Sequence, residues 1–183
     1  MVETLRLLAP RRVVLPGTVH TFPAEVVPDL GERVFVRFAG AAATAAGTVC
    51  DVEELRVRDD GGSIVTVFGS VRAVAVGGAG PRLEVRVEEL GSASPSDVAA
   101  AVAAFRSYLG ALAEYGEGAD VMVDVPDDPV AAGYRLASLA RISEPERQDL
   151  LDLASTKGRL SRIAAMFGRE RALLAATMGT RGA

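Results

Sequence analysis

The sequence changes its hydrophobic periodicity once, near residues 91–95, and this change limits the folds that the chain can adopt. Before it, short apolar runs are separated by Gly and Pro. One of these runs, Arg82–Leu90, alternates apolar and charged residues as a half-buried strand does. After it, apolar residues recur three and four positions apart, which is the spacing of an amphipathic helix. The sequence therefore predicts an α+β protein in which the strands come first and the helices follow.

Gly and Pro divide the first half of the chain into short β-type segments. Asp59–Gly62 lies between two of them and predicts a β-hairpin turn. Gly77–Pro81 predicts a second reversal, because Gly accepts positive φ angles and Pro cannot donate to a strand ladder. Residues 1–92 are therefore predicted to form a β-rich subdomain. Its expected strands are Thr4–Leu8, Arg12–Leu15, Arg33–Phe38, Gly47–Leu55, Ser63–Phe68, Val71–Val76 and Arg82–Leu90.

Three helix-start signals follow residue 92. Ser94–Asp97 combines an N-cap residue, a first-turn Pro and a first-turn acid, and Asp128 with Pro129 repeats the signal. Ser143–Glu146 has the form of a capping box, in which each of the two side chains binds the other residue's backbone N–H. Residues 93–183 are predicted to form a helical bundle, because each helix has one apolar face that needs a partner. The expected helices begin near Pro95 and then span Val130–Arg141, Glu144–Ala154 and Lys157–Thr177.

Composition excludes several functional classes. The chain has 20 basic and 24 acidic residues, a net charge of −4 and no long run of either sign, whereas a nucleic-acid-binding domain normally carries a basic stripe. A single histidine, His20, and a single cysteine, Cys50, cannot form a metal site of His and Cys ligands or an internal disulfide. No apolar stretch reaches the roughly 20 residues of a membrane span. We expect a cytoplasmic protein without cofactor or metal, and without a nucleic-acid or membrane partner.

The order of these segments resembles the amino-terminal substrate-binding domain of Lon-type proteases. In that family an opening strand leads into a turn rich in Val, Pro and Gly, and Val13–Gly17 stands in that place. The most specific likeness is in the late helical part, where Glu/Arg-Gln, Leu-Leu and Arg-Leu follow one another in the same order as in the family. The matching segments, spread over nearly the whole chain, are Val13–Gly17, Gly47–Val49, Gly69–Val74, Leu136–Leu139, Ser143–Leu151 and Arg159–Ile163.

The resemblance implies a compact PUA-like β pseudo-barrel followed by helices. It also implies a docking surface for unfolded or tagged polypeptides. As a stand-alone member, the chain is expected to be a non-catalytic recognition module, and an adaptor or regulator of proteolysis carried out by a protease in trans.

One departure from the family pattern predicts where a ligand would bind. Family members place a helix of a few turns after the opening Pro-Gly segment, whereas Pro23, Pro28 and Gly31 interrupt any helix here. We therefore expect Thr18–Pro28 to run irregularly over the surface, where binding residues are often found. The predicted ligand-facing residues are Pro16, His20, Phe22, Pro23 and Glu25.

Two other functions stay open at the level of sequence. The same scaffold could carry a small enzyme, of hydrolase or cyclase/isomerase type, with a small-molecule pocket and a Ser–His–acid arrangement around His20 and Glu25. A closed apolar pocket with a convergent His20 would favour the enzyme, and an open shallow groove would favour polypeptide binding. A structural subunit of a hetero-complex would instead show an apolar patch on the last helix.

We predict that the purified protein neither hydrolyses ATP nor degrades casein. Lys157, the single lysine, is followed by Gly158, so the Gly-Lys-Ser/Thr end of a phosphate-binding loop is missing. No motif places a nucleophile beside this lysine. Phosphate release and casein cleavage should both equal the buffer control, and nucleotide turnover by a homogeneous preparation would contradict the predicted non-catalytic role.

Overall fold

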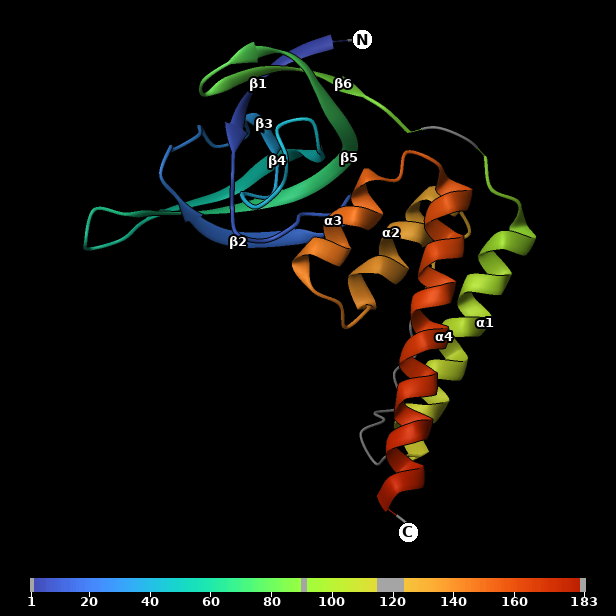
Figure 1. The fold of residues 1–183 in the computed structure, drawn as a ribbon. Helices are drawn as coiled ribbons and strands as arrows, with labels where there is room; N and C mark the ends of the chain where they lie inside the picture. Colours follow the sequence, from blue (N-terminus) through green and yellow to red (C-terminus); the bar gives the residue numbers. More distant parts are fainter. Residues whose placement is uncertain (1, 90–91, 115–123, 182–183) are drawn as a thin grey trace. The chain divides into compact units, whose positions relative to one another are not determined.

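The computed structural model of this chain describes residues 2–89, 92–114 and 124–181 (Figure 1). The strands are β1 (Val2–Leu8), β2 (Val19–Ala24), β3 (Arg33–Val36), β4 (Ala46–Val57), β5 (Ser63–Ala79) and β6 (Arg82–Val87). The helices are α1 (Pro95–Glu114), α2 (Pro129–Leu139), α3 (Glu144–Asp152) and α4 (Thr156–Arg181). The predicted α+β class and the order of strands before helices are confirmed. No helix in this described part of the chain is long and apolar enough to cross a membrane.

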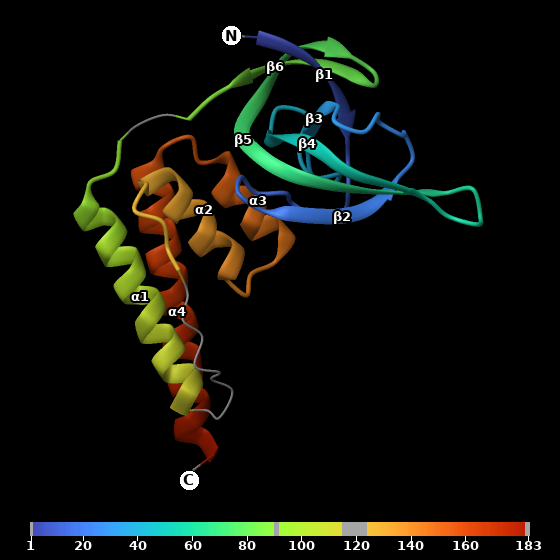
Figure 2. The ribbon, with the colours of Figure 1, turned by 180° about the vertical axis from the view of Figure 1, so that it is seen from behind.

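The six strands form one mixed sheet in the order β2-β5-β4-β3-β1-β6, and β5 also pairs with β6. Five strands therefore close into a ring, while β2 lies outside it (Figures 1 and 2). The long β5 closes the ring, because its first part pairs with β4 and its last part pairs with β6. Its register shifts opposite Val49/Cys50 and between Ala75 and Gly77, and such bulges bend a strand. Gly69 lies at the first bend, where an added Cβ would be 2.5 Å from the Leu15 carbonyl oxygen.

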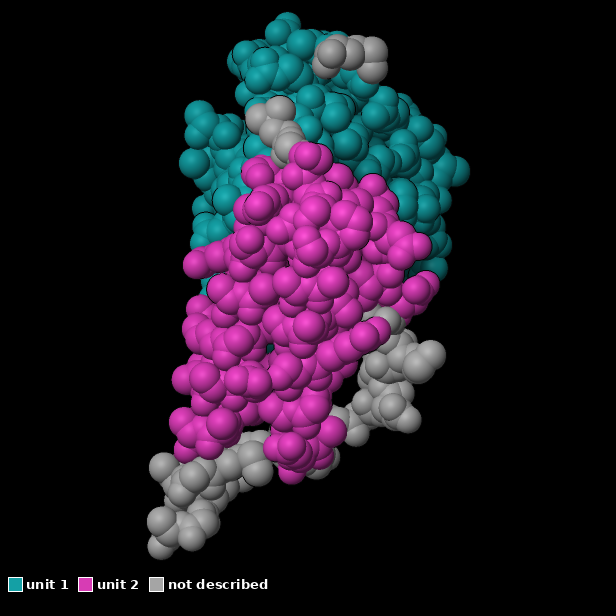
Figure 3. Space-filling view, turned by 90° about the vertical axis from the view of Figure 1, so that its right-hand side faces the viewer, with its two compact units in different colours: residues 1–90, 141–154 teal, residues 91–140, 155–183 magenta. Residues whose placement is uncertain are grey.

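The chain forms two compact units (Figure 3). The first contains residues 1–90 together with 141–154, and the second contains residues 91–140 and 155–183. Helix α3 thus belongs with the sheet, although the sequence pattern placed it with the other helices. A capping box of Ser143 and Glu146 begins α3, as expected. The Glu144 carboxylate then accepts a hydrogen bond from Val13 N–H at 2.6 Å, which joins this helix start to the segment before β2.

Three expectations about the β unit are wrong in detail. Val13–Leu15 is buried but is not a strand. Individual hydrogen bonds satisfy its backbone in place of a strand ladder, for example the bond that the Thr48 hydroxyl donates to the Val14 carbonyl. Ser63–Phe68 and Val71–Val76 are parts of one strand, since the intervening glycine bends the ladder without ending it. Thr18–Pro28 is not irregular throughout, because β2 occupies Val19–Ala24.

The second unit is built from α1, α2 and α4. Phe167 on α4 is 1% exposed, and its ring centroid lies 4.9 Å from that of Phe105 and 5.5 Å from that of Tyr108, both on α1. The Arg159 guanidinium lies 4.0 Å from the centroid of the Tyr134 ring on α2, so a buried charge is placed against an aromatic face. Asp128 caps α2 by accepting from Ala131 N–H at 2.8 Å.

The aromatic cluster gives a stability prediction. Phe167→Ala should lower the free energy of unfolding by about 3–5 kcal/mol, because it leaves a cavity between two helices. Leu173→Ala, on the same helix at a position 56% exposed, is the matched control and should change it by less than about 0.5 kcal/mol. Urea denaturation followed by circular dichroism measures both. Equal effects of the two substitutions would show that Phe167 is not a core residue.

Candidate functional site

Strand β2 is an edge strand. It pairs with β5 alone among the described strands, so one row of its backbone groups has no strand partner. An unpaired edge can pair with another extended chain, and native proteins often limit such pairing with proline. Pro23 lies near the end of β2, where it removes one backbone donor. The open edge is therefore available mainly along the first four residues of the strand, Val19–Phe22.

The outer face of β2 and β5 carries apolar side chains in contact with solvent. Val19 is paired with Phe68 across the two strands, and these side chains are 57% and 37% exposed. The next pair on the same face, Thr21 and Thr66, joins its hydroxyl groups at 3.0 Å. Exposed apolar residues beside an open edge are typical of a recognition surface. We call Val19, Thr21, Thr66, Phe68 and the edge of β2 the β2 surface.

More exposed apolar side chains follow β2 along the chain. Val26, Val27 and Leu30 are 40%, 45% and 69% exposed. With Val19, they place four of the ten large exposed hydrophobic residues of the described chain between residues 19 and 30. This stretch is therefore the part of the described chain where apolar groups most often face solvent.

The five predicted ligand-facing residues do not converge on one site. Phe22 is 7% exposed and packs in the core with Val65 and Val67, because alternation in β2 turns it away from Val19 and Thr21. Pro16 is buried as well, whereas Pro23 and Glu25 are exposed. Phe22 and Pro16 are thus corrected to interior residues.

His20 is half-buried next to the start of α3. Burial lowers the pKa of its imidazole below the usual 6.5, and the positive charges of Arg147 and Arg12 lower the pKa further, while the Glu144 carboxylate opposes them. Glu25 is not among the charged groups that act on His20. The ring is therefore neutral at neutral pH, and the structure gives no support to a His20–Glu25 couple.

Other reactive groups in the described residues are not arranged for chemistry. No group of three or more His, Cys, Asp or Glu side chains in this part of the chain could hold a metal ion. Cys50 is fully buried, and burial raises the pKa of its thiol far above the ordinary value. Cys50 is thus a small buried residue in the core of the β unit.

Sequence reasoning did not identify the two exposed apolar residues of the β2 surface, Val19 and Phe68. Val19 alternates with His20, Thr21 and Phe22 in a period-two pattern, but the following Pro23 hid the strand. Phe68 closes an alternating run whose neighbours Val65 and Val67 are buried, so its outward orientation could have been read from the period.

The environment of His20 predicts a pH effect on stability. Because the pKa in the folded state lies below 6.5, the unfolded chain takes up the proton first, and folding is weakened as the pH falls through this value. His20→Gln removes this proton uptake. The difference in unfolding free energy between wild type and variant should be constant above neutral pH and should shift in favour of the variant below about pH 6.5. Parallel profiles in urea denaturation at several pH values would contradict the assignment.

A scan of the sequence against protein-family models finds no match, and a search of curated proteins finds none either. Solved structures do match. The N-terminal domain of a Lon protease from the Mycobacterium avium complex is similar with a TM-score of 0.65 and 17% sequence identity, covering 91% of this chain and 98% of that chain. A Lon N-terminal domain protein from Xanthomonas campestris is similar with a TM-score of 0.57 and 21% identity, covering 89% of this chain and 98% of that chain.

Both neighbours are matched over almost their whole length, so the likeness includes the sheet and the helices together. These matches confirm the resemblance to the Lon amino-terminal domain at the level of its α+β fold. This chain has the fold of the Lon amino-terminal domain.

Proposed function

We propose that this protein is a non-catalytic polypeptide-recognition module, and that the β2 surface binds an extended, apolar segment of its partner. The observation that carries this proposal is the exposed Val19–Phe68 pair beside the unpaired edge of β2. The matched solved structures are Lon N-terminal domains, which supports the same class of function. The β unit is proposed to be a PUA-like pseudo-barrel that holds this surface rigid.

The physical basis is strand addition. A polypeptide that is unfolded or carries an exposed tag has free backbone N–H and C=O groups, and these can pair with the edge of β2. Side chains at alternate positions of the added segment would lie beside Val19, and large ones would reach across it toward Phe68 on β5, so the burial of these apolar groups would add to the affinity. Backbone pairing does not depend on sequence, whereas apolar contact does, so the module would select segments that are both extended and apolar.

The biological role that fits this mode is accessory to proteolysis. A module that holds extended apolar segments would deliver them to a protease supplied in trans, as an adaptor, or would control the protease's access to them. Neither role requires chemistry by the module itself.

A double substitution tests whether the β2 surface binds polypeptide. Val19→Thr with Phe68→Thr keeps the strand propensity and removes apolar area, and should weaken binding of fluorescently labelled, unfolded casein by about tenfold or more. The reason is that burial of one large apolar side chain contributes about 1.5–3 kcal/mol, and 1.4 kcal/mol corresponds to about tenfold. Fluorescence anisotropy measures the affinity.

Val57→Thr with Val76→Thr is the matched control, because both side chains are exposed on strands, at 74% and 44%, and neither residue pairs with β2. This control should bind casein like the wild type. Equal loss in both double variants would mean general apolar adsorption, and no loss in the first would move the binding surface away from β2.

A further inference from the structure

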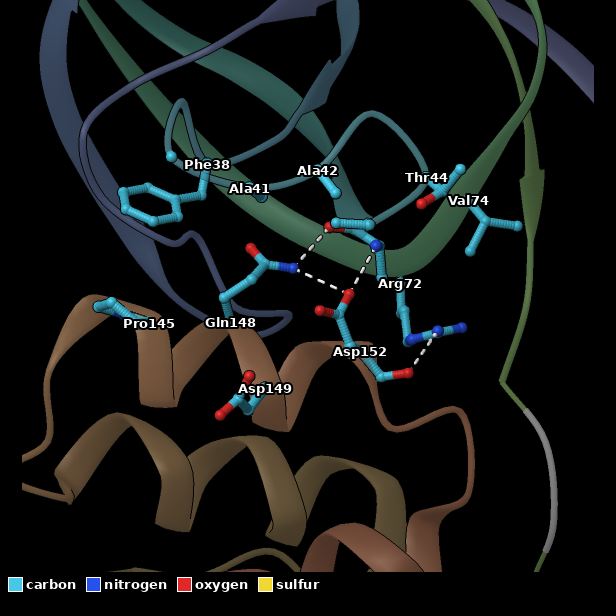
Figure 4. Close-up of a pocket in the computed structure, with 13 residues that line it drawn as sticks. Phe38, Ala41, Ala42, Thr44, Arg72, Val74, Pro145, Gln148, Asp149 and Asp152 are labelled. Carbon is cyan, nitrogen blue, oxygen red and sulfur yellow. Dashed lines mark hydrogen bonds between the residues drawn. The ribbon is translucent and has the colours of Figure 1, made fainter.

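A second concave site lies within the first unit, separate from the β2 surface. It is a cavity of about 470 Å³ between the loop of residues 38–45, the Arg72–Val74 part of β5, and α3 (Figure 4). Phe38, Ala42 and Val74 supply apolar wall, and Gln148 and Asp152 supply polar groups. This volume lies within the range of small-ligand pockets.

The orientation of the Gln148 amide is fixed by its partners. Its Nε2 donates to the Ala46 carbonyl at 2.9 Å and to Asp152 Oδ1 at 3.0 Å, and both partners can only accept. The opposite orientation would set oxygen against oxygen twice. The amide oxygen must therefore point the other way, and in Figure 4 it points into the cavity on the side of Phe38.

The Gln148 oxygen is a buried acceptor with unused capacity. Gln148 is 5% exposed, and its Oε1 has no hydrogen-bond partner among the residues that the structure describes. Leaving a buried acceptor unpaired is unfavourable in free energy, and such groups are normally paired. A ligand that donates a hydrogen bond at this point would recover that free energy.

Asp152 adds a negative charge beside this acceptor. Its Oδ1 accepts from Ala46 N–H at 2.7 Å as well as from Gln148, so the carboxylate is held in place. Its Oδ2 makes no hydrogen bond within the described part of the chain. Asp149, one turn earlier on α3, also lines the cavity and is exposed. The unpaired acceptors of the site are thus oxygens, and its exposed rim carries the Asp149 carboxylate.

The one basic lining residue does not reverse this polarity. The Arg72 guanidinium donates to the carbonyls of Leu151 at 2.6 Å, Glu88 at 2.5 Å and Asp152 at 3.0 Å. Each of its three nitrogens is therefore engaged by the protein backbone. Arg72 holds the walls of the cavity together, and its single positive charge is outnumbered by the two lining carboxylates, Asp149 and Asp152.

We infer that this cavity binds an organic cation, a guanidinium or alkylammonium group on an apolar stem. The cationic group would donate N–H bonds to Gln148 Oε1 and Asp152 Oδ2, and the stem would lie against Phe38 and Val74. Charge-assisted hydrogen bonds are about twice as strong as neutral ones, so the carboxylate favours a cation over a neutral donor. The ligand can be a free small molecule or an arginine or lysine side chain of a bound polypeptide, since both offer the same chemistry.

The test is an NMR titration of the full-length, ¹⁵N-labelled protein with two ligands of the same shape. n-Butylguanidinium should give saturable shifts of the Gln148 side-chain amide and of the Ala41, Ala45 and Ala46 backbone amides. Its neutral isostere, n-butylurea, should bind about tenfold more weakly or not at all. Absence of saturable shifts for the cation, equal affinity for the urea, or shifts confined to other residues would each overturn the inference.

Two variants that each remove one negative charge test whether Asp152 attracts the cation. Asp152→Asn keeps an oxygen for Ala46 and Gln148 but removes the negative charge, and should weaken binding of n-butylguanidinium about tenfold. Glu53→Gln removes the same charge from an exposed position on β4 and should change affinity by less than about twofold, because exposed charges are screened over about 10 Å. Equal effects of the two variants would mean non-specific attraction by the net charge. If Asp152→Asn does not fold, the comparison of n-butylguanidinium with n-butylurea on the wild-type protein still tests the inference.

A third ligand shows whether the bound cation is a free small molecule or a side chain of a polypeptide. A five-residue peptide with a central arginine should shift the same amides if the site takes polypeptide side chains. Shifts from n-butylguanidinium without shifts from the peptide would assign the site to free small cations. Both results support the cation site, and neither depends on binding at β2.

Discussion

One buried guanidinium holds the first unit together. Arg72, which is 3% exposed on β5, donates to the carbonyls of Glu88, Leu151 and Asp152, and so joins three segments far apart in the sequence. Leu151 and Asp152 are the last two residues of α3, whose final carbonyls have no partner within the helix. Arg72 satisfies two of them and places a positive charge at the negative end of the helix dipole. A buried cation is costly to desolvate, and this arrangement offsets that cost with several charge-assisted hydrogen bonds.

The start of α3 is fixed to the same unit by a different contact. The Glu144 carboxylate accepts from Val13 N–H, and Gln148 in the middle of the helix donates to the Ala46 carbonyl. The start, middle and end of this nine-residue helix each bind the β unit, so a helix that follows two others in sequence becomes part of the same unit as the sheet. The cavity with the open Gln148 oxygen is a direct result, because it lies where α3 meets the loop before β4.

Local patterns predicted much of this fold. The alternation of Arg82–Leu90 and the capping box at Ser143 identified a strand and a helix start, because both depend on neighbours within a few residues. The position of α3 could not be predicted in this way, because it depends on Arg72 and Gln148, whose partners lie 16 to 102 residues away. Of the predicted site residues, Phe22 is interior because the phase of β2 is set by its pairing with β5. Proline suggested irregular structure there, although an edge strand tolerates it.

The proposed function depends on pairing between the open edge of β2 and an extended polypeptide. Amide hydrogen exchange of the protein, alone and saturated with unfolded casein, tests this pairing directly. In the free protein, the amides of Val19–Phe22 that point away from β5 should exchange quickly, because they have no strand partner. In the complex they should become protected, while the amides of the closed ring stay unchanged. Binding without any added protection in β2 would contradict strand addition at this edge.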